Sequence, residues 1–154
     1  MPGYAELQDI LGYCFSNPRL MDEATLAQDA PSTAPPKTHG NKSLALVGDA
    51  LIRLDVAGRS YAGGIGTAES TILLSEIGSN RSLEAHGRRL GLDKFVIKHP
   101  GQQGQDVPRE TLASTVEALI GAVWIDSGQD FNQVQSVIGN LGIGNPKHEE
   151  EANT

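Results

Sequence analysis

The chain has 154 residues, of which 38% are hydrophobic and 20% are charged, and its formal net charge is −7. This length and balance predict one domain of the soluble globular class, and no apolar run is long enough to span a membrane. The negative charge argues against a generic nucleic-acid binder, because phosphates are neutralised by Lys and Arg. The N-terminus carries no secretory signal, so we expect an intracellular protein, cytoplasmic or nuclear, with a mitochondrial location left open.

The first predicted element is a short amphipathic helix from Tyr4 to Leu11, which Gly12 ends. A second helix is expected after Pro18. Between the two lies the only cysteine of the chain, Cys14, so no disulfide within one chain is possible. A lone cysteine beside Phe15 is usually a small buried hydrophobe. The alternative is a symmetric disulfide between the Cys14 residues of two subunits.

After a proline-rich loop over residues 29–40, the central predicted helix runs from Asn41 to Leu54. Ala45 and Asp49 are four residues apart and share one face, and Gly48 leaves open space beside the carboxylate. A second helix or a bulky ligand can therefore approach closely there. The apolar core face is built by Leu44, Val47, Leu51 and Leu54.

The middle of the chain predicts a glycine-rich turn, a long helix from Thr67 to Leu83, and a helix over residues 82–90 with His86 near its polar face. A polar loop from Lys98 to Val107 follows. Five arginines in this part of the chain suggest a basic rim, and the alternative is a set of solvated helix faces. They are Arg53, Arg59, Arg81, Arg88 and Arg89.

The second key helix is predicted from Pro108 to Ile125, where Ser114 and Glu117 are three residues apart and share a face. Each key helix thus carries an acid beside small residues, so we expect Asp49 and Glu117 to face one another. One more amphipathic helix includes Phe131 and later apolar residues. No alternating pattern competes with the helical ones, so the fold class is all-α, with a domain over residues 1–144 and a polar, disordered tail over residues 145–154.

Both key stretches resemble signature regions of the ribonuclease III family. Residues 41–50 read NKSLALVGDA, which is similar to the family pattern N-E-R-L-E-F-L-G-D-A. Residues 113–126 read ASTVEALIGAVWID, which is similar to A-D-x-x-E-A-L-I-G-A-x-x-x-D. The resemblance covers nearly the whole chain. It implies a ribonuclease III-like endonuclease domain that forms a homodimer and acts on double-stranded RNA.

In this family four carboxylates per subunit hold Mg²⁺, and their places here are Ala45, Asp49, Ser114 and Glu117. The resemblance therefore makes Asp49 and Glu117 the candidate catalytic residues and weak ligands for one Mg²⁺ or Mn²⁺. Positions 45 and 114 are vacated, and a further glutamate of the family is replaced by Lys42. We expect Mg²⁺-dependent cleavage to be weak or lost.

The resemblance leaves two functions open, an RNA-processing enzyme with a reduced metal site and a non-catalytic dimeric RNA-binding or scaffold protein of the ribosome-associated type. The chain ends about where the nuclease domain would end. We therefore expect no double-stranded-RNA-binding domain and only weak, salt-dependent RNA binding. The pattern does not identify the RNA-contacting residues.

A second surface of the central helix, formed by Leu46, Ala50 and Arg53, suits a dimer partner. The alternative is a helix buried on both sides within one subunit.

Overall fold

The computed structural model describes residues 3–27, 40–98 and 100–152, and these form an all-α domain. The only β-type pairing among these residues is an isolated bridge between Leu26 and Ile97. None of the described helices is long and apolar enough to cross a membrane. The helices are α1 (Tyr4–Leu11), α2 (Arg19–Thr25), α3 (Lys42–Ala62), α4 (Thr67–Ile77), α5 (Asn80–Arg89), α6 (Arg109–Asp126), α7 (Phe131–Asn140) and α8 (Pro146–Ala152), with short 3-10 turns η1 (Leu92–Phe95) and η2 (Pro100–Gln102).

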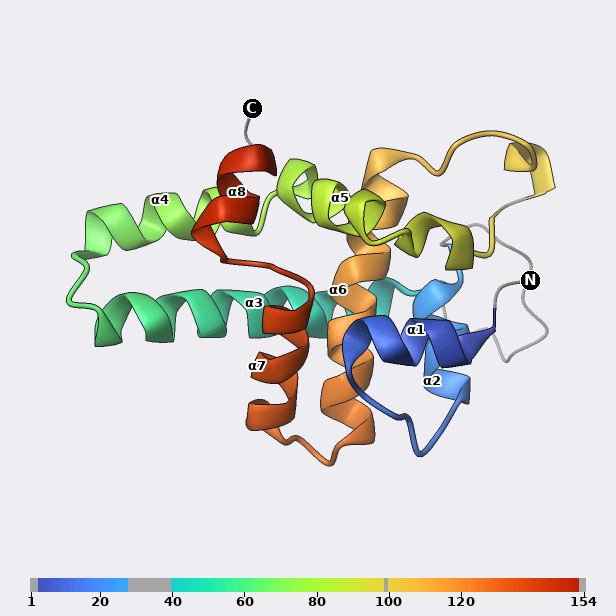
Figure 1. The fold of residues 1–154 in the computed structure, drawn as a ribbon, viewed down its shortest axis with the longest axis horizontal. Helices are drawn as coiled ribbons and strands as arrows, with labels where there is room; N and C mark the ends of the chain where they lie inside the picture. The colour runs from blue at the N-terminus through green and yellow to red at the C-terminus, as the bar shows by residue number, and fades with distance from the viewer. Residues whose placement is uncertain (1–2, 28–39, 99, 153–154) are drawn as a thin grey trace.

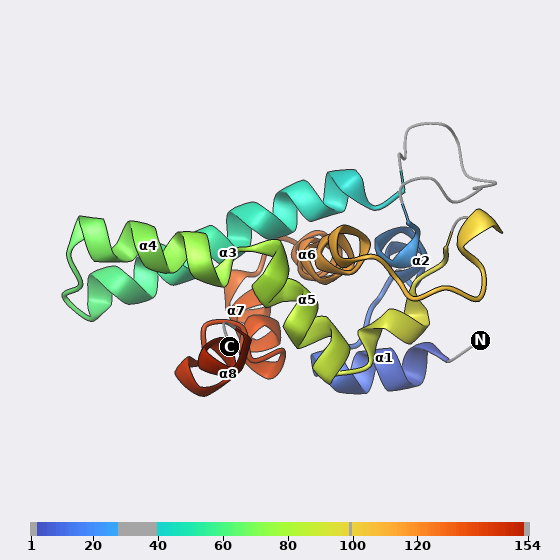
Figure 2. The same ribbon diagram turned by 90° about the horizontal axis from the view of Figure 1, so that it is seen from above.

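Helix α6 is the centre of the core. Figure 2 shows it end-on, surrounded by α2, α3, α5 and α7, and it contacts all four. From Leu112 to Val123 only Glu117 is not buried. A helix that is apolar on nearly all sides needs such an enclosed position, because no side is left to face water.

Helices α3 and α6 cross at two glycines, and these allow the backbones to touch. A Cβ atom on Gly48 would lie 1.8 Å from the carbonyl oxygen of Glu117, and one on Gly121 would lie 2.2 Å from that of Leu44. The open space predicted beside Asp49 is therefore filled by the backbone of α6. This close approach fixes the distance between the two key helices.

Beyond the crossing, α3 continues away from the body and forms a hairpin with α4 (Figure 1). The predicted helix from Thr67 to Leu83 was too long, because the chain breaks at Gly78 and Ser79 caps α5 by accepting a hydrogen bond from the Ser82 amide at 3.1 Å. Placing Leu54 in the core was also wrong. It is 56% exposed, because this part of α3 lies in the projecting hairpin.

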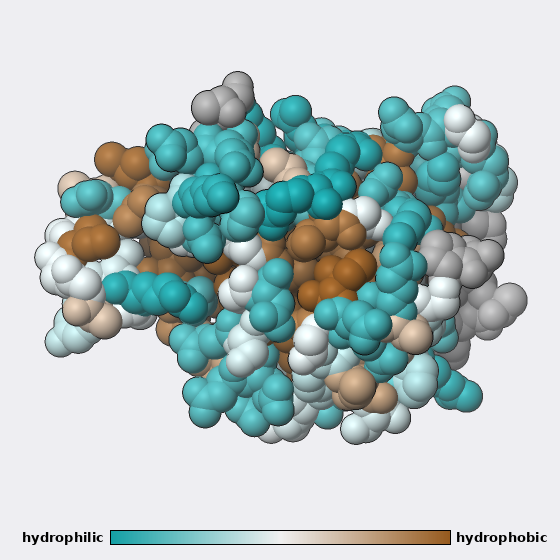
Figure 3. Space-filling view, viewed as in Figure 1, coloured by the Kyte–Doolittle hydropathy of each residue, from teal (hydrophilic) through white to brown (hydrophobic). Residues whose placement is uncertain are grey.

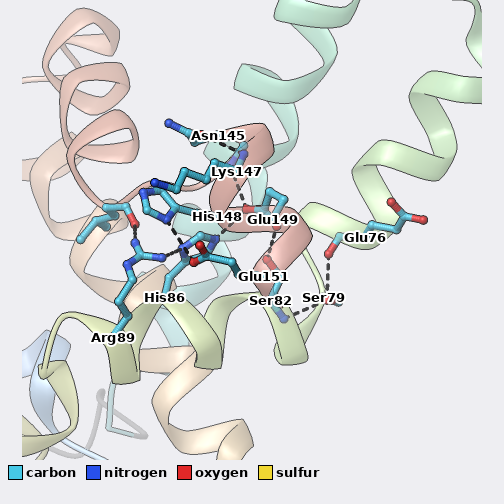
Figure 4. Close-up of polar contacts among 12 residues, drawn as sticks. Glu76, Ser79, Ser82, His86, Arg89, Asn145, Lys147, His148, Glu149 and Glu151 are labelled. Carbon is cyan, nitrogen blue, oxygen red and sulfur yellow. Dashed lines mark hydrogen bonds and ion pairs between the residues drawn. The ribbon is translucent and has the colours of Figure 1, made fainter. Parts of the chain in front are cut away.

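The C-terminal segment corrects two further predictions. Residues 146–152 form α8 rather than a disordered tail, and α8 packs against α5. His86 is fully buried rather than on a polar face, because its Nε2 contacts Glu149 Oε1 of α8 at 2.6 Å. Figure 4 shows this buried cluster, in which Ser82 donates to Glu149 Oε2 at 2.6 Å and Arg89 lies beside His86.

Candidate active site between helices α3 and α6

The start of α3 is held in place by a buried asparagine. Asn41 donates from Nδ2 to the carbonyl of Ala24 at 2.9 Å and lies 3.2 Å from the Thr115 hydroxyl. These contacts tie α3 to α2 and to α6 at the point where the candidate site begins. Further along α3, Gly48 seats the helix on α6, so the α3 backbone is held against α6 at both ends of this segment.

The structure brings Asp49 and Glu117 together across the α3–α6 crossing, as the sequence predicted. Glu117 is half-buried, and its pKa is raised to about 7. Burial is the main cause, followed by the neighbouring charge of Asp49 and a hydrogen bond between the two carboxyl groups. The positive charges of Lys42 and Arg53 act in the opposite direction. A carboxyl group whose pKa is raised by burial and by a neighbouring carboxylate is a recurrent feature of catalytic sites, and structural networks show it too.

The two vacated positions lie on the same helices. Ala45 is buried and contributes no polar atom, whereas Ser114 is buried and accepts a hydrogen bond from Lys42 Nζ at 3.2 Å. Lys42 is thus directed toward the site from the first residue of α3. The sequence showed that Lys42 stands where the family pattern has a glutamate, but it did not show the bond to Ser114.

The predicted basic rim is largely neutralised. Three of its five arginines form ion pairs four residues along their own helices, Arg53 with Asp49 at 3.2 Å, Arg59 with Asp55 at 3.0 Å and Arg88 with Glu84 at 3.1 Å. Arg89 instead donates to the carbonyl of Leu141 at 2.8 Å. This arrangement matches the alternative of solvated helix faces.

Sequence reasoning missed the role of Asp126 at the end of the second signature. Its carboxylate accepts hydrogen bonds from the Tyr13 hydroxyl at 2.7 Å and from the amides of Ser16 and Asn17, both at 2.8 Å. These bonds hold the pKa of Asp126 below its ordinary value despite partial burial. The acid anchors the loop between α1 and α2, and an acid at the end of the signature was the one available signal. Cys14, in the same loop, is exposed and not the buried hydrophobe that its neighbour suggested.

Comparison with known proteins agrees with this geometry. The family model described as Ribonuclease III domain matches residues 42–128, more than half of the chain, and this span includes both key helices. The chain belongs to the ribonuclease III family. It is 32% identical over 141 residues to the Ribonuclease 3 of Idiomarina loihiensis, covering 89% of this chain and 58% of that protein. It is 30% identical to that of Francisella tularensis, covering 90% of this chain and 57% of the relative.

The fold is also found among solved structures. The nuclease domain of ribonuclease III from Campylobacter jejuni superposes with a TM-score of 0.80 at 20% sequence identity, covering 94% of this chain and 99% of that one. A second structure of the same domain gives a TM-score of 0.79. The chain therefore spans little more than half the length of the two curated ribonucleases above and nearly the whole of a nuclease domain.

The residues at the four family positions do not fit a two-ion magnesium site. Mg²⁺ requires hard oxygen ligands in octahedral geometry. Here Ala45 offers a methyl group, and the Ser114 hydroxyl is neutral and already bound by an ammonium. Within the described part of the chain, no three His, Cys, Asp or Glu side chains are grouped so that they could hold a metal ion.

Proposed function

We propose that this ribonuclease III domain acts on or binds double-stranded RNA, and that its Mg²⁺-dependent cleavage is weak or lost. The observation that carries the proposal is the meeting of Asp49 and Glu117 across the α3–α6 crossing. These two acids stand at signature positions of the family, and their side chains are the only candidate catalytic groups that remain there. Mg²⁺ or Mn²⁺ would be the cofactor of any residual cleavage.

The small number of ligand oxygens at the site supports the proposal that Mg²⁺-dependent cleavage is weak or lost. A two-metal phosphodiester cleavage site needs oxygen ligands that hold both ions, and two of the four family positions supply none or a neutral one. In the cleavage step Asp49 and Glu117 would serve as carboxylate ligands. The raised pKa of Glu117 means that this group must first lose its proton, which costs binding energy near neutral pH.

A second candidate function is a non-catalytic, dimeric RNA-binding or scaffold protein of the ribosome-associated type. It is favoured by the vacated positions Ala45 and Ser114, which leave the fold of the α3–α6 crossing intact. The ion-paired arginines fit it as well, because duplex RNA would have to compete with acids of the same helices for Arg53, Arg59 and Arg88, and a protein partner would add binding surface.

The dimer belongs to the same proposal. The stripe Leu46, Ala50 and Arg53 is exposed along α3, so it is not buried on both sides within one subunit. Figure 3 shows apolar surface at the end of the molecule formed by the α3–α4 hairpin. The nuclease domain from Campylobacter jejuni has structural flexibility in a region involved in its dimer formation. The large exposed apolar side chains on the two hairpin helices are Leu46, Leu54, Tyr61 and Ile72.

A cleavage assay on long duplex RNA with Mg²⁺ or Mn²⁺ tests the enzyme against the scaffold. Cutting that disappears in Asp49→Asn and in Glu117→Gln would establish the enzyme. Retention of the duplex without cutting at any metal concentration would establish the scaffold. The variant Ala45→Glu with Ser114→Asp should raise cleavage, and no gain in a folded protein would contradict our interpretation of the vacated positions.

Sedimentation at several concentrations tests the dimer, and a monomer at all of them would refute it. The exposed thiol of Cys14 keeps a disulfide between subunits as a proposal. Gel mobility without reductant decides it, because a monomer band in both reduced and non-reduced lanes would end the idea.

A further inference from the structure

The first observation concerns charge at the N-terminus of α3. Lys42 is the first residue of this helix, and no acidic residue lies in the first turn. A cation is unfavourable at that end, because the helix dipole is positive there. Contacts with groups outside α3 would offset this cost for Lys42.

The compensating groups lie on the candidate site. Lys42 Nζ donates to the buried Ser114 hydroxyl at 3.2 Å, one turn of α6 before Glu117. The ammonium is close enough to Glu117 for its charge to act on that carboxyl group. The bond and the attraction together direct the long side chain toward the face of α6 that carries Ser114 and Glu117.

A second cation stands on the other side of the pair. Arg53 Nε lies 3.2 Å from Asp49 Oδ2, and its charge also acts on Glu117. With both carboxyl groups ionised, Asp49 and Glu117 carry two negative charges, which Lys42 and Arg53 balance. With one proton bound, the group carries a net positive charge. In neither state does the site attract a divalent cation as a four-carboxylate cluster would.

We propose that the Lys42 ammonium is the resident cation of this site and takes the charge-balancing place of a metal ion. This inference starts from the site of the proposed function and adds what occupies it. A unit charge about 5 Å from a divalent ion weakens its binding about tenfold even at the dielectric constant of water. Position 42 then decides whether an ion binds, in addition to the vacated positions 45 and 114.

The test is Mn²⁺ binding by titration calorimetry on the full chain, without RNA. We expect no saturation of the wild type below millimolar Mn²⁺. Lys42→Gln should bind Mn²⁺ at least tenfold more tightly, and Lys42→Glu more tightly still. Adding Glu117→Gln to Lys42→Glu should remove the gain, since the ion would lose a ligand.

A matched control separates this effect from overall charge. Lys94→Gln makes the same change in net charge on η1, where Lys94 pairs with Glu6 away from the site, and it should leave Mn²⁺ binding unchanged. Lys42 is exposed, so its variants should fold, and thermal unfolding verifies this. A wild type that binds Mn²⁺ as tightly as Lys42→Gln would overturn the inference, and so would an equal gain in Lys94→Gln.

Failure here is distinguishable from failure of the proposed function. Duplex RNA retention in EDTA, measured separately, tests RNA binding, whereas the Mn²⁺ titration contains no RNA. If RNA is not retained but the Lys42 variants gain Mn²⁺ affinity, the resident cation stands and the RNA proposal falls. If RNA is retained and the Lys42 variants gain no Mn²⁺ affinity, the RNA proposal stands and the resident cation falls.

Discussion

Adding one methyl group to Gly48 tests whether the close approach of α3 and α6 determines both the stability of the domain and the geometry of the candidate site. The new Cβ would lie 1.8 Å from the carbonyl oxygen of Glu117. Even the closest favourable carbon–oxygen contacts are about 3.3 Å, so the helices must separate by roughly 1.5 Å. The position of the Cβ is fixed by the backbone of α3 and the oxygen belongs to the backbone of α6, so no side-chain rotation can relieve the contact.

The expected loss follows from the packing around the crossing. Overpacking a core typically costs about 1–3 kcal/mol, and separating α3 from α6 also loosens the buried side chains of Leu44, Leu51 and Ile52. We therefore expect Gly48→Ala to lower the free energy of unfolding by about 3–4 kcal/mol. With a denaturation slope of about 2 kcal/mol/M, the urea midpoint falls by roughly 1.5–2 M.

Urea unfolding followed by far-ultraviolet circular dichroism measures this change. Gly139→Ala in α7 is the matched control, since a Cβ there meets nothing within 4 Å, and alanine in a helix should add about 0.5–1 kcal/mol. The reciprocal variant Gly121→Ala should behave like Gly48→Ala, because its Cβ would lie 2.2 Å from the Leu44 carbonyl. If Gly48→Ala unfolds at the wild-type midpoint, the close crossing is not what holds these helices.

Three further predictions concern carboxyl groups whose pKa values are shifted in the folded protein. Because the folded-state pKa of Glu117 is raised to about 7 from an ordinary 4.5, the free energy of unfolding should fall as pH rises between these values, and Glu117→Gln should flatten that slope in urea titrations. The full difference is about 3 kcal/mol, and partial exposure reduces it to roughly 1–2 kcal/mol. Glu149 has the opposite sign, since its hydrogen bonds to His86, Ser82 and the Gly144 amide hold its pKa below 4.5 despite burial. Its stabilisation is present above pH 4.5 and lost in more acid solution, and Glu149→Gln should cost about 2 kcal/mol at pH 7, with wild-type stability as the contradicting result. The pKa of Asp126 is also lowered, so Asp126→Asn should remove a contribution to the free energy of unfolding that the wild type loses in acid solution. The variant should also speed hydrogen exchange at the Ser16 and Asn17 amides, and unchanged exchange there would exclude the anchoring role.

The local patterns predicted the helices well where apolar residues recur with helical spacing. The helix Tyr4–Leu11 and the second signature helix lie where their periodicity placed them. The juxtaposition of Asp49 and Glu117 followed from the same periodicity together with the family resemblance. These are properties of short stretches, so sequence reasoning can reach them.

The errors arose where distant segments decide the outcome. Leu54 has the spacing of a core residue, but the hairpin carries it out of the body. His86 looked polar because its partner Glu149 lies 63 residues later in a segment expected to be disordered. A buried His–Glu contact is invisible in either stretch alone, since each residue by itself is typical of a solvated face.

The residues at positions 45 and 114 affect the electrostatic cost of packing α3 closely against α6. Ala45 is only 6% exposed and Ser114 only 8%, so carboxylates at these positions would be nearly buried beside Asp49 and Glu117. Burying several like charges without a cation costs several kcal/mol, which the family offsets with metal ions. In this chain the methyl group, the hydroxyl and the Lys42 ammonium each remove part of that cost. The α3–α6 crossing is made by backbone contacts at Gly48 and Gly121, so under our proposal the nuclease fold does not depend on a bound ion.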